Sequence, residues 1–230
     1  MAAAQIVAKA AEIDPERSLE FVKELSLSGW ELTNSLRGYV QATARDGRWR
    51  EVIGQLEYFE NYRDASAGPR ALSPGTENMI ATEWVREDFE EGMRWFTGEI
   101  KRDYSNPKDV KNVASVLAGI PEEEQYQVLD WVQTQREKSG WHDGVVMALG
   151  KTLVVAGPTA NTERLVGLIS SEGDRFEFVT QFIGSSTPHH LDKLRHSPES
   201  LNRLVEAARL TEANTARLKE VIAGAKWTGS

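Results

Sequence analysis

The tetrapeptide Leu19-Glu20-Phe21-Val22 is repeated along the chain at a nearly constant interval, and this repetition is the strongest fold signal in the sequence. Close copies follow at residues 56–59 (LEYF), 93–96 (MRWF), 129–132 (LDWV), 165–168 (LVGL) and 201–204 (LNRL). The steps between the first residues of successive copies are 37, 37, 36, 36 and 36. So steady a period indicates a repeat array, in which each supersecondary unit packs on its neighbours.

The flanks of the tetrapeptide indicate that it belongs to a helix. Leu19, Val22 and Leu25 are spaced by three residues, which places them on one face of a helix. Residues 14–16 (DPE) supply a capping residue, a first-turn proline and a first-turn acid in the order that opens a helix. Acids also precede later copies, where they complement the helix dipole. We therefore interpret the repeated positions as a helical core.

The third position of the tetrapeptide allows a second interpretation. It is aromatic in the first four copies, as Phe21, Tyr58, Trp95 and Trp131. These side chains could form an exposed ladder for a ligand. Large aromatics at helical spacing more often pack in a core, where each buries on the order of 150–250 Å², and we expect packing here.

Periodicity, caps and turn residues together predict an all-α fold. The expected helices are residues 2–12, 15–27, 31–45, 48–62, 76–86, 88–101, 108–118, 122–138, 143–155, 161–170, 174–184 and 198–223, with a short helix between the proline starts at 187–188 and 197–198. Residues 64–75 predict a loop inside a repeat, because the step of 37 is kept across them. The expected architecture is a right-handed α-solenoid of about six helix-pair repeats with a period of 36–37 residues, forming one domain over residues 1–230. Residues 198–223 are expected to cap the array, and residues 226–230 to fray.

The second repeat resembles the tetratricopeptide family. Its residues Gly47, Trp49, Val52, Ile53 and Leu56 fall where that family places its turn glycine, a tyrosine-like residue, a small residue, an aliphatic residue and an aromatic residue. Later repeats depart from this pattern, since residues 84, 120 and 156 stand where the second repeat has its glycine. The period is also similar to that of HEAT-type solenoids. The resemblance implies a scaffold for proteins or peptides and no catalytic residues.

Composition narrows the classes of function. The net charge is −8, and residues 141–230 carry ten basic and ten acidic side chains. Nucleic-acid binders usually present a basic face, so a nucleic-acid-binding repeat is the weaker alternative, through a stripe of Arg195, Arg203, Arg209, Arg217 and Lys219. The chain lacks cysteine, which excludes disulfides and thiolate metal sites. Without a long apolar run or a basic leader, the sequence predicts a cytoplasmic protein and no membrane span.

Two stretches resemble catalytic or metal-binding motifs. His189, Asp192 and His196 are spaced by three and four residues, so one helical face could offer two imidazoles and a carboxylate to zinc or iron. They make a metal-dependent enzyme or metal-binding protein the runner-up. Residues 149–152 (LGKT) match the end of a phosphate-binding loop, but Val145 stands where that motif requires glycine. We expect no cofactor and no metal site.

The leading expectation is a non-enzymatic scaffold that binds a protein or peptide along the first helices of its repeats. The candidate contacts are polar residues on otherwise apolar helices, namely Arg37, Gln41, Glu83, Arg86, Lys111, Asn112 and Lys151. The sequence predicts neither the partner nor the oligomeric state.

Overall fold

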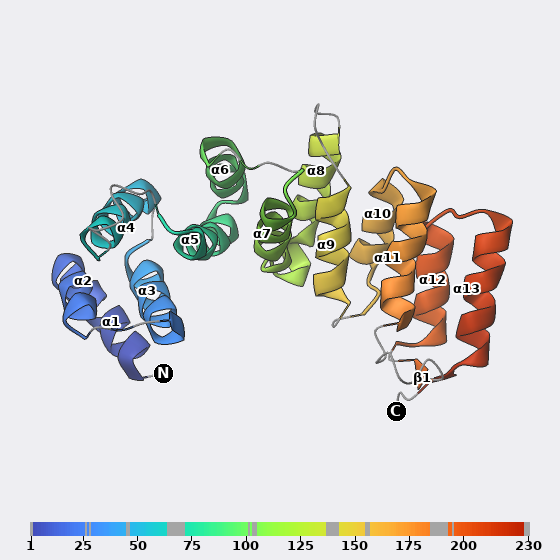
Figure 1. The fold of residues 1–230 in the computed structure, drawn as a ribbon, viewed down its shortest axis with the longest axis horizontal. Helices are drawn as coiled ribbons and strands as arrows, with labels where there is room; N and C mark the ends of the chain where they lie inside the picture. The colour runs from blue at the N-terminus through green and yellow to red at the C-terminus, as the bar shows by residue number, and fades with distance from the viewer. Residues whose placement is uncertain are drawn as a thin grey trace. The chain divides into compact units, whose positions relative to one another are not determined.

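The structure, a computed structural model, describes residues 2–25, 27, 29–44, 47–63, 72–100, 102, 105–136, 143–154, 157–184, 193–194 and 196–227. Within these ranges the fold is all-α, with thirteen α-helices and a bridge of two short strands (Figure 1). The helices fall into two compact units, Met1–Lys101 and Arg102–Ser230. The boundary lies between the third and fourth copies of the repeated tetrapeptide.

The first unit contains six α-helices and a π-helical turn. These are α1 (Ala2–Ile13), α2 (Pro15–Glu24), α3 (Gly29–Thr43), α4 (Trp49–Arg63), α5 (Pro74–Glu87), α6 (Phe89–Arg94) and the π-helix Trp95–Glu99. Three pairs of next-but-one helices pack together, α1 on α3, α3 on α5 and α2 on α4, and α6 packs on α5. Asp14 caps α2 by accepting the backbone N–H of Arg17 at 3.0 Å, and Ser73 and Asp88 cap α5 and α6 in the same way.

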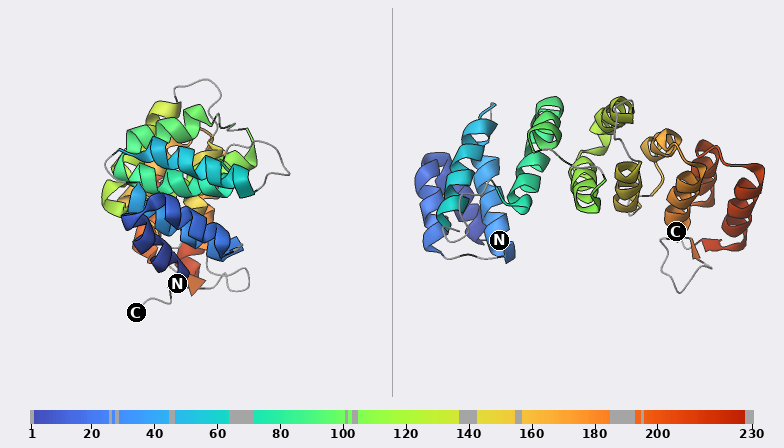
Figure 2. Two further views of the ribbon diagram at one scale, coloured as in Figure 1. Left: turned by 90° about the vertical axis from the view of Figure 1, so that its left-hand side faces the viewer. Right: turned by 45° about the horizontal axis from the view of Figure 1, so that its top comes forward.

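The second unit continues this alternating contact pattern. Its elements are α7 (Pro107–Ala118), a 3₁₀ turn (Glu122–Glu124), α8 (Gln125–Arg136), α9 (Gly144–Leu153), α10 (Ala160–Leu168), α11 (Glu172–Gly184), α12 (Pro198–Ala207) and α13 (Glu212–Gly224). Here α7 packs on α9, α9 on α11, α8 on α10 and α10 on α12. Figure 2 shows α12 and α13 side by side at the end of this unit.

The six copies of the tetrapeptide lie in alternate helices, one each in α2, α4, α6, α8, α10 and α12, with the third copy running from α6 into the π-helix. The first residue of every copy is buried, and so is the fourth residue of all but the copy in α10. First and fourth residues lie three apart and therefore share one helix face. The prediction that the repeated positions form a helical core is confirmed for these two positions.

The third position of the tetrapeptide does not have one role. Trp95 is buried, Tyr58 is 69% exposed, and Phe21 and Trp131 are half-buried. In an α-helix the third residue points about 200° away from the first, so it reaches the flank or the back of the core face. The aromatics at this position therefore form neither a uniform core stripe nor an exposed ladder.

Four aromatic side chains form a cluster in the core of the first unit. The rings of Trp49 and Trp84 stack with centroids 5.7 Å apart and planes 10° apart, and Trp95 lies 5.5 Å from Trp84. Phe96 continues the group, with its centroid 6.4 Å from that of Trp95. The indole N–H of Trp49 donates to the carboxylate of Glu87 at 2.7 Å. Residues from α4, α5 and the π-helix are thus held together by ring contacts that the period alone does not indicate.

The loop and turn predictions are confirmed in part. Gly47, the turn glycine of the tetratricopeptide resemblance, precedes α4 with φ of 77°, a conformation that favours glycine. Of the predicted loop at 64–75, residues 64–71 lie outside the described residues, and α5 begins at Pro74.

The last predicted helix, 198–223, is wrong as a single element, because α12 ends at Ala207 and α13 starts at Glu212. Arg209 stands in the turn between them with φ of 47°, a left-handed position where glycine or asparagine is usual. Because the turn carries neither glycine nor proline, the sequence contains no ordinary stop signal there.

Two further expectations for the C-terminal region are corrected. Lys226–Trp227 was expected to fray, yet it pairs in parallel with Lys193–Leu194, with Lys193 opposite Lys226. Lys193–Leu194 also falls in the segment expected to form a short helix, and it forms a strand. The two strands lie more than 30 residues apart in the sequence, so local patterns do not reveal their pairing.

Two charged residues of α11 hold the turn that follows α12. Arg175 donates from Nε to the carbonyl oxygen of Ala208 at 2.7 Å, and from Nη1 to those of Ile169 and Ser170 at 2.9 and 2.8 Å. The carboxylate of Glu172 accepts from the backbone N–H of Thr211 at 3.0 Å, and also from the Thr211 hydroxyl and the Asn214 amide. The backbone around residues 208–211 is therefore fixed by α11.

The hydrogen bonds to Glu172 make part of the stability depend on pH. The Thr211 N–H, followed by the side chains of Asn214 and Thr211, lowers the pKa of Glu172. A lowered folded-state pKa stabilises the protein above the unfolded pKa of about 4.3, and this stabilisation is lost as pH falls through the folded value. We expect Glu172→Gln to lower the urea midpoint at pH 7 and to flatten the loss below pH about 4.3. Glu177→Gln, on the exposed side of α11, is the control; equal acid slopes for Glu172→Gln and wild type would contradict the assignment.

Candidate functional site

The seven residues predicted to contact a partner lie in two sets. Arg37 and Gln41 are exposed on α3, and Glu83 and Arg86 lie on the adjacent α5, where their side chains form an ion pair at 3.6 Å. The second set, in the other unit, consists of Lys111 and Asn112 on α7 and Lys151 on the adjacent α9. All seven are exposed or half-buried, and none of them lines the three hollows described below.

Of the three side chains predicted to bind a metal, the structure describes only His196. His189 and Asp192 lie outside the described residues. His196 places Nε2 2.9 Å from the carbonyl oxygen of Val154. A carbonyl only accepts, so Nε2 carries a proton and donates, and His196 ties the end of α9 to the start of α12. Among the residues that the structure places, no group of three or more metal-ligating side chains is arranged to hold an ion.

Helix α1 is apolar on two faces. Val7 and Ala11 are buried, and α1 approaches α3 so closely that a Cβ on Gly38 would lie 2.6 Å from the carbonyl oxygen of Ala4. On another side Ile6 is 53% exposed and Ile13 is 86% exposed. Such a helix is ordinarily covered on both apolar faces, which makes the open face of α1 a candidate contact surface.

An open groove runs between this face and α2. We call it the N-terminal groove; its volume is about 350 Å³ and it is lined by Ile6, Ala10, Ile13, Asp14, Arg17, Ser18 and Phe21. Ile6, Ala10 and Ile13 follow each other at steps of four and three, so they form one stripe along α1. The lining is mainly apolar. Such a shape accepts the apolar face of a helix or an extended peptide.

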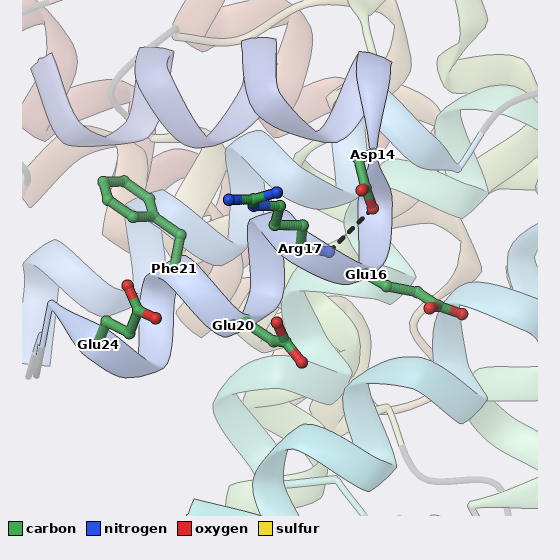
Figure 3. A pocket seen from close by; sticks show the side chains of 6 residues that line it. All are labelled: Asp14, Glu16, Arg17, Glu20, Phe21 and Glu24. Atoms are coloured by element: carbon green, nitrogen blue, oxygen red, sulfur yellow. Dashed lines mark hydrogen bonds between the residues drawn. The ribbon is translucent and has the colours of Figure 1, made fainter.

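Carboxylates border the N-terminal groove. A second hollow of about 450 Å³ shares Asp14, Arg17 and Phe21 with the groove and adds Glu16, Glu20 and Glu24. Figure 3 shows Arg17 and Phe21 on the side of α2 that faces α1, with the three glutamates spaced along α2. These glutamates are four residues apart, a spacing at which like charges repel and destabilise a helix. A cationic partner would relieve that repulsion.

Sequence patterns alone did not single out this groove. The run at residues 2–13 predicts a helix, and its alanines and isoleucines fit a core helix equally well. The sequence does show apolar residues on two faces of this run. That the second face is exposed becomes evident only when α1 is packed on α3. The acids of α2 are exposed, and their position beside the groove is recognisable only once α1 and α2 are placed.

In the portion of the chain that the structure describes, no helix is long and apolar enough to cross a membrane. Comparison with known proteins found no matching family model, no matching curated protein and no matching solved structure.

Proposed function

We propose that this chain is a non-enzymatic helical-repeat scaffold that binds a basic amphipathic segment of a protein partner in the N-terminal groove. The observation that carries the proposal is the apolar groove of about 350 Å³ beside a row of carboxylates. Apolar side chains of the partner would cover Ile6, Ile13 and Phe21. Flanking lysines or arginines would lie against Glu16, Glu20 and Glu24.

The helical-repeat part of the proposal is supported by the arrangement of helices within each unit. Every copy of the tetrapeptide lies in the second helix of a pair, and within each unit most helices contact the next helix but one. Three copies fall in each unit. We propose that the six pairs belong to one right-handed α-solenoid. Arrays of this kind present extended surfaces that bind proteins and peptides.

The binding energy in this proposal comes mainly from apolar burial. Fully covering an exposed isoleucine side chain stabilises a complex by roughly 1.5–3 kcal/mol. The carboxylates contribute attraction that is screened by salt over about 10 Å at 0.1 M ionic strength. Affinity should therefore depend on both isoleucines at any ionic strength, and the association rate should fall as salt is added.

The experiment is a fluorescence anisotropy titration of the full chain with a labelled helix-forming peptide of leucines and lysines. We expect Ile13→Arg to weaken binding about tenfold or more, since it removes the apolar contact of a nearly fully exposed isoleucine and adds a charge that repels the lysines of the peptide. Ile6→Ser should weaken binding by a smaller factor, because Ile6 is only 53% exposed before the peptide binds. Glu20→Lys should weaken binding at low salt and reduce its salt dependence. The same peptide with alanine in place of leucine should bind more weakly.

The matched control is Val221→Arg, which changes a partly exposed aliphatic residue on α13, far from the groove in sequence. It should leave the affinity for the leucine–lysine peptide unchanged. An Ile13→Arg variant that binds this peptide as well as wild type does would reject the groove as its site. A wild-type dimer that Ile13→Arg dissociates would also overturn the proposal, because the groove would then hold a second copy of the chain.

A further inference from the structure

A third hollow lies in the second unit, across α8, α10 and α12, which pack side by side in that order. Its volume is about 520 Å³. Leu129 and Leu168 give it an apolar surface, and its charged lining residues are Arg164, Arg209 and Glu163. The carboxylate of Glu163 is paired with Arg203, which leaves the two arginines as the unpaired charges of the lining within the described part of the chain. We call it the arginine hollow. It combines an apolar surface with these two unpaired cations, whereas the N-terminal groove is bordered by the glutamates of α2.

Gly167 keeps the floor of the arginine hollow open. It lies in α10, and a Cβ built there would have its nearest neighbour, the carbonyl oxygen of Ala207, at 3.9 Å, an ordinary contact distance. Packing therefore does not require glycine at this position. Glycine is disfavoured inside helices, so its presence weakens α10 and leaves space above the helix for a side chain of a ligand.

Arg209 is held in place at one edge of the hollow. Its backbone has φ of 47°, a conformation that costs energy for any residue with a Cβ. Arg175 and Glu172 of α11 fix the residues on either side, through the Ala208 carbonyl and the Thr211 N–H. A long cationic side chain thus extends from a fixed turn where glycine would be more stable. Because the backbone at Arg209 is already ordered, binding has to restrict only the rotamers of its side chain.

The charges around the hollow favour a carboxylate ligand. Arg203 pairs with Glu163 at 3.1 Å and Lys219 with Glu206 at 3.1 Å. Arg164 and Arg209 have no such pair among the residues that the structure describes. Guanidinium groups bind carboxylates with two parallel hydrogen bonds. Two cations beside an apolar floor therefore match a segment that carries carboxylates next to an aliphatic side chain.

The same arrangement disfavours nucleic acid as the ligand. Of the basic stripe predicted from the sequence, Arg203 and Lys219 are paired with acids, and Arg217 lies 5.6 Å from the ring centroid of Phe176. Arg195 lies outside the described residues. Nucleic-acid binding needs an extended basic face. Of the residues in the predicted stripe, only Arg209 lines the hollow, so the positive charge there is local.

The geometry points to a second binding site, in which the arginine hollow holds an acidic peptide segment of a partner. An aliphatic side chain of the segment lies over Gly167 between Leu129 and Leu168. Its carboxylates pair with Arg164 and Arg209. This site shares no lining residue with the N-terminal groove, so it goes beyond the function proposed above and does not rest on it.

The test is a titration of the full chain with a labelled peptide of leucines and glutamates, followed by anisotropy. We expect the double variant Arg164→Ala with Arg209→Gly to weaken binding about tenfold or more, as loss of two charged contacts should. Gly167→Leu should have a similar effect by filling the hollow. Arg209→Gly alone should raise the midpoint of thermal unfolding while weakening binding, a combination that a purely structural arginine would not produce.

Matched control variants test whether the acidic peptide binds in the arginine hollow and not elsewhere on the chain. Gly54→Leu changes another exposed helical glycine whose Cβ would have no neighbour within 4 Å, and Arg94→Ala removes an exposed arginine of α6. Both should keep wild-type affinity for the acidic peptide, and so should Ile13→Arg in the N-terminal groove. Binding that survives both the double variant and Gly167→Leu would overturn the proposal. Tighter binding of a single-stranded oligothymidine than of the peptide, lost in the double variant, would also overturn it.

Discussion

Replacing Trp84 with alanine is expected to lower the free energy of unfolding by about 3–5 kcal/mol, the usual cost of removing a large buried aromatic side chain. Trp84 is 1% exposed and its ring lies between those of Trp49 and Trp95. The substitution therefore removes two ring contacts and leaves a cavity at the centre of the first unit. Urea unfolding of the full chain, followed by far-UV circular dichroism, measures the loss.

Two other tryptophan substitutions test whether the loss of stability comes from removing the ring of Trp84. The indole N–H of Trp84 is buried, and no acceptor for it is found in the described part of the chain. Trp84→Phe removes this unsatisfied donor and keeps most of the ring, so it should cost well under half as much as alanine. Trp30→Ala changes a residue that is 70% exposed and should shift stability by less than about 0.5 kcal/mol. A Trp84→Ala variant as stable as Trp30→Ala would show that the ring stack contributes little.

Replacing Gly150 with alanine is expected to destabilise the second unit by about 1–3 kcal/mol, the usual range for overpacking a core. A Cβ on Gly150 would lie 2.3 Å from the nearest ring atom of Phe178. Phe178 is fully buried and packs against Phe182, with ring centroids 5.3 Å apart, so the ring has little space into which it can move. The added methyl group must push α9 away from α11.

The sign of the stability change distinguishes Gly150→Ala from an ordinary glycine-to-alanine substitution in a helix. Glycine-to-alanine changes inside helices ordinarily stabilise by up to about 1 kcal/mol, and Gly54→Ala, with nothing within 4 Å of its Cβ, should do so. Phe178→Leu should relieve part of the clash. Combined with Gly150→Ala, it should cost less than the sum of the two single changes in a double-mutant cycle. Urea midpoints that rise equally for Gly150→Ala and Gly54→Ala would contradict the close approach of α9 and α11.

Local sequence rules predicted the helices well. The three-residue spacing of the apolar positions, the proline starts at residues 15 and 198 and the acids of the first turns each depend on residues within one helical turn, and the helices follow them closely. The first position of the repeated tetrapeptide is buried in every copy. These features could be predicted because helix formation and amphipathic burial are encoded at short range.

Features that depend on distant residues were missed. The turn at Arg209 is held by side chains of α11 rather than by a local glycine, and the strand pairing of Lys193 with Lys226 joins remote segments. The candidate binding surfaces were missed for the same reason. A groove and a hollow arise from how three or four segments pack, whereas the seven polar residues chosen from helix periodicity describe exposure alone.

Arg175 connects the C-terminal ends of two helices in the second unit. Its guanidinium binds carbonyl groups just beyond the ends of two helices, Ile169 and Ser170 after α10 and Ala208 after α12. One cation thus opposes the partial negative charge of two helix dipoles. If the last turn of either helix frays, the Arg175 guanidinium loses the hydrogen bonds to that helix. It is then less well positioned to donate to the carbonyl groups of the other helix. We therefore expect the ends of α10 and α12 to open together in native-state hydrogen exchange.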